Sequence, residues 1–169
     1  MAALGIKDIE KEVRKMEYML DVVEKTGAWP SGERSASSQL RQDLCFFTIF
    51  LAVSDKGIDN KLLDFINKVL RYNLNVNDVR AIIYGVDGDY CDVMLSGVSD
   101  VIIDACDAED ELRNRGMDAK MYLPKKLAEL FGMVGKAFIG DEHSKDKLHA
   151  YELFMMKINS FLSSEGYYD

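Results

Sequence analysis

Four acidic residues at two helix corners are the side chains best suited to chemistry. The first corner (residues 54–59) and the second corner (residues 140–144) each lie between two long apolar runs. Carboxylate oxygens are the ligands that calcium and other hard cations prefer in proteins. If the two corners face each other, they can form a divalent-cation site. Its ligands would be Asp55 and Asp59 from the first corner and Asp141 and Glu142 from the second.

The same carboxylates also suit a purely structural role, which the sequence favours. An aspartate that follows one helix and precedes the next can accept hydrogen bonds from the free N–H groups of that next helix. Its negative charge also matches the positive end of the helix dipole. A cation site would require the two corner regions to be antiparallel neighbours.

Other short motifs indicate no catalytic centre. Asp87 and Asp92 only partly match a calcium loop, because their spacing places Asp92 where an EF-hand needs glycine. His143 and His149 are six residues apart, which does not match the helical HExxH zinc motif. The sequence contains no GxxxxGKS/T, GxGxxG or GxSxG motif. We therefore expect no enzyme activity, and no cofactor other than the divalent cation considered above.

The cysteines fit neither a disulfide framework nor paired zinc ligands, because they are three in number and far apart. We expect Cys45, Cys91 and Cys106 to be reduced. Cys45 and Cys106 lie in apolar helical stretches, where free cysteine usually behaves as a small buried hydrophobe. A reactive thiol is the alternative.

Apolar spacing predicts the helices of the first half of the chain. Between residues 6 and 23 the spacing alternates between three and four, which indicates an amphipathic helix that ends near Gly27. Residues 40–53 are apolar on nearly every face and predict a central buried helix, although a strand is the alternative for so dense a run. A further helix is predicted over residues 62–70. The stripe of the first helix consists of Ile6, Ile9, Val13, Met16, Leu20 and Val23.

Residues 28–38 are rich in Pro, Gly and Ser and predict a loop. This loop holds Trp29, the only tryptophan. We expect its ring to fold back onto the core, and an exposed ring would instead be an anchor for a partner.

Capping residues mark helix starts in the middle of the chain. Asn75 and Asp78 resemble a capping pair and predict a short helix over residues 78–84. A second short helix is predicted near residues 98–104. The acidic stretch 100–111 indicates a solvated face, with a docking surface for a basic partner as the alternative.

The last third of the chain predicts two longer helices. Pro124 suits the first residue of a helix that runs to about residue 139. Ser144 can cap the final helix, and the tail (residues 163–169) is predicted to be frayed. The inward residues of the final helix would be Leu148, Tyr151, Met155, Ile158 and Leu162. We expect an all-α fold of about seven to eight helices and no sheet.

The two corners resemble those of the tellurite-resistance protein B-like (TerB-like) group. In that group an apolar helix ends in a motif close to Ala-Asp-Gly-x-Ile-x-x-x-Glu, and the next helix follows directly. Asp55 and Ile58 match this motif, whereas Gly57 is displaced by one position and Leu62 stands in place of the glutamate. The second corner keeps its aspartate, Asp141, without the following glycine.

The resemblance covers residues 45–72 and 124–163 and implies an all-α fold, which also occurs in the N-terminal domain of a membrane-anchored DnaJ-type co-chaperone. We therefore expect one all-α domain over residues 1–169, with two pseudo-repeated helix-corner-helix arms (residues 40–72 and 124–163). Residues 73–123 form a variable middle outside the resemblance.

Charge and composition limit the partners and the location. The net charge of −8, from 21 basic and 29 acidic side chains, repels phosphate and argues against nucleic acid as a partner. No apolar run approaches the roughly 20 residues that span a bilayer, so direct membrane insertion is not expected. The early residues are charged and lack the apolar stretch of a secretory signal, which favours the cytoplasm.

These observations favour a non-catalytic interaction or scaffold protein that binds a protein partner, which is the role that the TerB-like resemblance implies. The alternative is a metal-responsive sensor that binds calcium or another divalent cation through the acidic corners.

Overall fold

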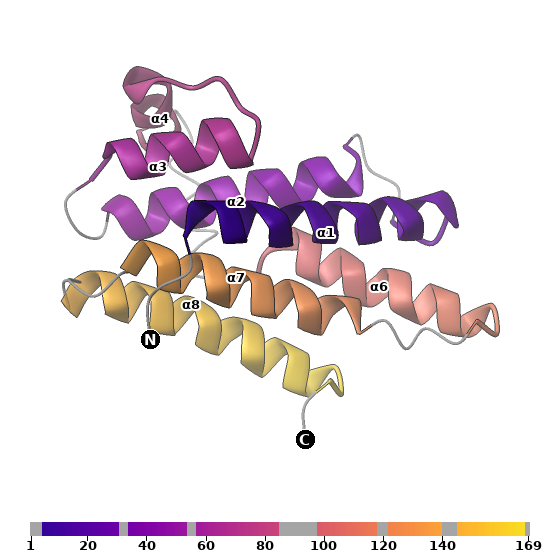
Figure 1. Ribbon diagram of the computed structural model, residues 1–169. Coiled ribbons are helices and arrows are strands. Elements are labelled where there is room, and N and C mark those ends of the chain that lie inside the picture. The colour runs from indigo at the N-terminus through magenta and orange to yellow at the C-terminus, as the bar shows by residue number, and fades with distance from the viewer. Residues whose placement is uncertain are drawn as a thin grey trace.

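The protein is all-helical in the parts of the chain that the structure, a computed structural model, describes (Figure 1). These parts are residues 5–30, 34–53, 57–84, 98–117, 122–139 and 145–167. They contain seven α-helices, a π-helical segment (η1) and no strand, which confirms the predicted all-α fold. The helices are α1 (Ile6–Lys25), α2 (Ala36–Val53), α3 (Asn60–Asp64), which continues into η1 (Phe65–Val69), α4 (Val76–Ile83), α6 (Asp100–Asn114), α7 (Leu123–Ile139) and α8 (Lys145–Ser164).

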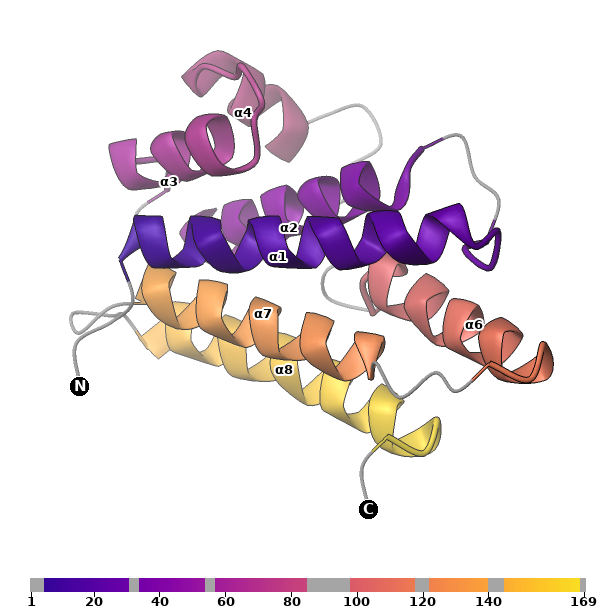
Figure 2. The same ribbon diagram turned by 45° about the vertical axis from the view of Figure 1, so that its right-hand side comes forward.

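Helix α2 lies at the centre of the bundle, as predicted, but it begins at Ala36, so the last three residues of the predicted loop 28–38 are helical. Thirteen of its eighteen residues are buried, so it has almost no solvent-facing side. It contacts α1, α3, α6, α7 and α8. Figures 1 and 2 show α1 and α2 side by side above α7 and α8, with α6 alongside and α3 and α4 on top.

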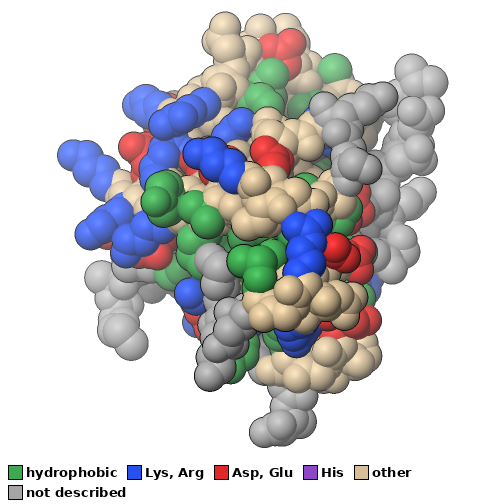
Figure 3. All heavy atoms as spheres, turned by 90° about the vertical axis from the view of Figure 1, so that its right-hand side faces the viewer, with side chains coloured by type: hydrophobic (Ala, Val, Ile, Leu, Met, Phe, Trp, Pro, Cys, Tyr) green, Lys and Arg blue, Asp and Glu red, His purple; other side chains and the backbone are tan. Residues whose placement is uncertain are grey.

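Helix α1 has one buried face and one solvent-facing face. Its predicted stripe is confirmed for Ile9, Val13, Met16, Leu20 and Val23, which are buried, whereas Ile6 is only half-buried. The helix ends at Lys25, and Gly27 follows with a φ of +79°, which an L side chain rarely adopts. Lysine and arginine side chains gather on the left of Figure 3, the side on which α1 lies.

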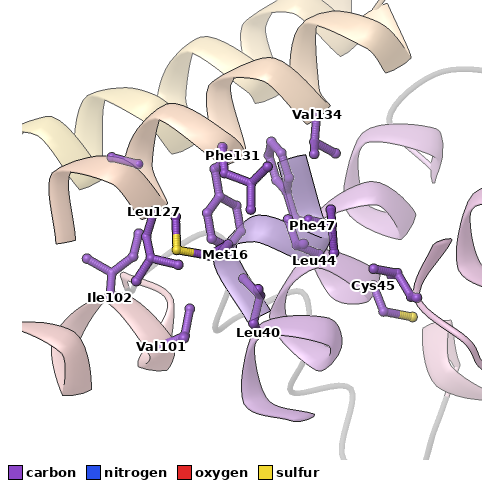
Figure 4. Close-up of a cluster of buried hydrophobic side chains, with 14 of the residues drawn as sticks. Met16, Leu40, Leu44, Cys45, Phe47, Val101, Ile102, Leu127, Phe131 and Val134 are labelled. Carbon is purple, nitrogen blue, oxygen red and sulfur yellow. The ribbon is translucent and has the colours of Figure 1, made fainter. Parts of the chain in front are cut away.

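Aromatic rings join α2 to the C-terminal helices. Phe47 of α2 stacks on Phe154 of α8 with ring centroids 4.2 Å apart, and it contacts Phe131 of α7 at 5.4 Å. Figure 4 shows Phe47 and Phe131 among the aliphatic side chains of this core. The buried residues of α8 are Ala150, Phe154, Ile158 and Leu162. Of the predicted inward residues, Ile158 and Leu162 are buried, whereas Leu148, Tyr151 and Met155 are only half-buried.

Several helix ends differ from the prediction. The capping pair of Asn75 and Asp78 is confirmed by two reciprocal hydrogen bonds of 2.9 Å, but α4 begins at residue 76. Pro124 is the second residue of α7. Helix α6 has 15 residues and is longer than the predicted short helix near residues 98–104, because it also contains the rest of the acidic stretch 100–111. Ser144 lies outside the described residues.

The predictions of a frayed tail (residues 163–169) and of a solvated acidic face (residues 100–111) are each correct only in part. Tyr167 is half-buried, and its hydroxyl donates a 2.7 Å hydrogen bond to Glu109 of α6, so the tail is fixed as far as this residue. Glu109 itself is only 3% exposed, so one residue of the acidic stretch is buried.

Trp29 is 8% exposed, which confirms that its ring folds back onto the core. Within the described residues, no helix is both long and apolar enough to cross a membrane.

Helices α7 and α8 approach closely at Gly135, so a larger side chain at this position should destabilise the fold. A Cβ at this position would overlap the ring of Tyr151 and lie 3.1 Å from Phe47 Cζ. We expect Gly135→Ala to lower the free energy of unfolding by about 1–3 kcal/mol, as overpacking does. Thermal unfolding followed by circular dichroism measures this change.

Gly132, one turn earlier in α7, provides the matched control. Its nearest side-chain atom would be Met155 Cε at 3.6 Å, which is an ordinary contact. Gly132→Ala should therefore gain helix propensity, worth about 1 kcal/mol. Equal stabilities of the two variants would contradict the close approach at Gly135.

Candidate functional site

The structure describes one of the four carboxylates predicted to bind a cation. Asp59 precedes α3, and its Oδ1 accepts a hydrogen bond of 2.9 Å from the backbone N–H of Leu62. This is the capping role that the sequence favours. Asp55, Asp141 and Glu142 lie outside the described residues.

Residues that flank the two corners lie against each other. Phe65 of η1 packs edge-on against Phe138 of α7, with ring centroids 5.2 Å apart. Lys61 Nζ donates a hydrogen bond to the carbonyl of Ala137 and lies 5.4 Å from the centroid of the Phe138 ring. A cation is favourable here because the last carbonyls of a helix carry partial negative charge. The lysine therefore supplies a positive charge at the C-terminal end of α7.

Within the described residues, no group of three or more His, Cys, Asp or Glu side chains is arranged to hold a metal ion. The cation site at the corners stays a prediction. The described geometry shows a capping aspartate and a lysine that neutralises a helix end.

Asp43 is a buried carboxylate at the junction of α2 and α6. Its Oδ2 accepts a hydrogen bond of 2.9 Å from the backbone N–H of Val101 in the first turn of α6. Nearby, Gln39 Nε2 donates to Asp104 Oδ2 at 2.6 Å. Burial raises the pKa of Asp43 from 3.8 to about 7, and the hydrogen bond from Val101 opposes this shift. Asp43 therefore caps α6 from a different helix.

Glu109 performs a similar function at the junction of α6 and α7. Its carboxylate accepts hydrogen bonds from the backbone N–H of Leu123, at the start of α7, and from the hydroxyl of Tyr167. Burial, and next the hydrogen bond to Glu109, raise the pKa of Tyr167 above its ordinary value. The tyrosine therefore stays a neutral donor at physiological pH.

Glu17 connects α1 to α2 and η1 through two arginines. It forms ion pairs with Arg14 and, at 2.5 Å, with Arg41. Arg14 also donates to the carbonyl of Val69 at 2.6 Å, which is the last residue of η1. A buried carboxylate of this kind is stable only when it is paired. All three buried acids are therefore held by structural partners.

The described cysteines are buried, as predicted. Burial raises the pKa values of Cys45 and Cys106 to about 12, so both are almost entirely thiols at neutral pH. Cys91 lies outside the described residues. Nothing in these surroundings activates a sulfur nucleophile.

The solvent-facing side of α1 is the surface best suited to binding. We define the α1 ridge as the exposed residues Lys7, Lys11, Lys15, Tyr18, Val22 and Lys25. They follow one another at intervals of four, four, three, four and three, which places them on one line along the helix. A shallow hollow beside the ridge is lined in part by Arg14 and Met19.

The ridge combines charge with exposed apolar surface. Tyr18 is 71% exposed and Val22 is 39% exposed, and both stand between lysines. The other large hydrophobic side chains that are exposed in the described parts of the chain lie outside α1. They are Tyr84, Met117, Tyr122 and Met156.

Sequence reasoning missed both the buried acids and the ridge. Asp43 lies within the apolar stretch 40–53, and that position was a signal of burial. Glu109 lies among several acids, and only its place on the buried face with Ala105 and Leu112 separates it from them. The ridge is the complement of the core stripe of α1, and its spacing was available from the sequence.

Comparison of the chain with protein-family models, with curated proteins and with solved structures found no match. The TerB-like resemblance therefore rests on the corner motifs alone and stays a prediction.

The burial of Asp43 predicts a pH-dependent stability. Between about pH 4 and pH 7 the folded protein keeps the Asp43 proton, whereas the unfolded chain loses it. The free energy of unfolding therefore falls as pH rises across this window, by at most about 1.4 kcal/mol per pH unit. Asp43→Asn keeps an acceptor for Val101 without a charge. We expect its stability relative to the wild type to rise from pH 4 to pH 8.

Urea unfolding at several pH values measures this difference. The control is Asp107→Asn, which removes an exposed carboxylate from α6. Its free energy of unfolding should follow pH in parallel with that of the wild type. A parallel profile for Asp43→Asn would show that Asp43 titrates as an ordinary exposed carboxylate.

Proposed function

We propose that this protein is a non-catalytic cytoplasmic interaction or scaffold protein that binds a protein partner through the α1 ridge. The observation that carries the proposal is the exposure of Tyr18 and Val22 along a line of lysines on one helix face. This role is also the one that the TerB-like resemblance implies.

Tyr18 has the properties of an interface anchor. Its ring is rigid and amphipathic, so a partner can bury it with little loss of side-chain entropy. Apolar surface that leaves water contributes about 25 cal/mol per Å². The hollow beside Tyr18, with Met19 in its lining, offers further apolar surface to the same partner.

The lysines add orientation and specificity to this apolar centre. Lys7, Lys11 and Lys15 lie on one side of Tyr18 along the helix, and Lys25 lies beyond Val22. Charged groups around an apolar centre steer association and reject partners of like charge. The whole chain has a net charge of −8, whereas the residues of the ridge include four lysines. An acidic protein surface can recognise this local positive charge.

The alternative function is a divalent-cation sensor that uses Asp55, Asp59, Asp141 and Glu142. Of these four residues, Asp59 is described, and it is engaged as a helix cap. The sensor stays a hypothesis that metal titration can test.

Site-specific photocrosslinking tests the interaction function. A benzophenone amino acid at position 18 should form a defined adduct in lysate of the native cells, with the partner identified by mass spectrometry. The adduct should disappear in the double variant Lys11→Glu/Lys15→Glu, because the reversed charges repel an acidic partner. The purified partner should then bind the wild-type protein and lose affinity for the double variant.

Tyr84 provides a matched control, because it is an exposed tyrosine outside the ridge, with 81% exposure. A benzophenone at position 84 should not form the same adduct. Identical adducts from both positions, or an adduct from position 18 that survives the charge reversal, would exclude the ridge as the binding surface.

A further inference from the structure

The spacing of the α1 ridge matches that of a helix–helix contact. From Lys11 to Lys25 the ridge residues alternate by four and three, which places them on one line that a second helix can follow. The opposite face of α1 uses the same spacing to pack onto the core. A helix of 20 residues is about 30 Å long, so the ridge can accommodate about three heptads of a second helix.

The charges of the ridge define the chemistry of that second helix. The ridge contains four lysines and no carboxylate. Within the described residues, only Lys15 of these four forms an ion pair, with Glu12 at 3.3 Å, and both of these side chains are solvent-exposed. A bound helix with acidic side chains opposite the lysines would supply the missing counter-charges.

The acidic residues of α1 favour a narrow partner over a flat anionic surface. Asp8 and Glu12 lie on one flank of the ridge, and Glu10 and Asp21 lie on the other. A membrane surface would come near both flanks and would be repelled by these carboxylates. A single helix can lie along the ridge and leave the flanks in solvent.

A second copy of this chain offers a weaker match. The outer face of α6 is acidic, but Asp104 accepts a hydrogen bond from Gln39, and Glu111 is paired with Arg115. That face also lacks exposed large apolar side chains to contact Tyr18 and Val22.

We propose that the α1 ridge binds an acidic amphipathic helix of a partner protein, with carboxylates opposite the lysines and apolar side chains opposite Tyr18 and Val22. This inference rests on the proposed interaction function and specifies the class of partner. The partner helix lies along α1, with its apolar side chains on Tyr18 and Val22 and its carboxylates beside the lysines.

A designed peptide tests this inference with the full-length protein. The probe is a fluorescent three-heptad helix with Glu facing the lysine positions and Leu facing Tyr18 and Val22. Its fluorescence anisotropy should report binding that weakens as salt is raised. A scrambled peptide of the same composition should bind at least about tenfold more weakly.

A charge swap shows whether the predicted residues meet. Lys11→Glu/Lys15→Glu should weaken binding of the Glu peptide by at least about tenfold, and a peptide with Lys at the two facing positions should restore it. Circular dichroism confirms that the variant is folded. Equal binding of matched and scrambled peptides, or no rescue by the Lys peptide, would overturn the inference.

Two further measurements separate the competing partners. The first is co-sedimentation with phosphatidylserine vesicles. An affinity for the vesicles that is higher than the affinity for the peptide would replace the helix partner with a membrane. Self-association that is lost in the double variant would overturn it in favour of a second copy. If the peptide fails but the lysine-dependent crosslink from position 18 persists, the interaction function stands and only the helical partner is excluded.

Discussion

The structure depends on the pairing of polar groups that the burial of α2 removes from water. Five other helices contact α2, and thirteen of its eighteen residues are buried, so every buried polar side chain on it needs a partner. Asp43 satisfies this requirement by capping α6, and Arg41 does so by pairing with Glu17 of α1. Each of these contacts joins α2 to a different helix at a defined point.

The same physical rule explains how much the sequence could predict. The stripe of α1, the apolar run of α2 and the capping box of Asn75 and Asp78 are local patterns, and the structure confirms all three. The roles of Asp43 and Glu109 depend on partners 58 and 14 residues away, respectively. Local patterns can indicate that an acid is buried, as for Asp43 in the apolar stretch 40–53, but they do not identify its partner.

The described acids discussed above form structural contacts, whereas the outer face of α1 is exposed to solvent. The net charge of −8 suggests an abundance of potential metal ligands, yet the buried acids and Asp59 are engaged with N–H groups, a hydroxyl or arginines. The outer face of α1 differs, because its lysines, Tyr18 and Val22 face solvent while its core stripe is buried. The side of α1 that the fold does not use is therefore the side available to a partner.

Thermal unfolding with and without divalent cations tests most directly whether the acidic side chains are structural. The protein would be unfolded in chelator and then in calcium, magnesium, manganese or zinc. A bound ion at 100 times its dissociation constant would stabilise the native state by about 2.7 kcal/mol. If the acidic side chains are structural, the melting temperature should be the same in all conditions. A rise with one ion that is lost in Asp55→Asn would contradict it and assign the corners to a metal site.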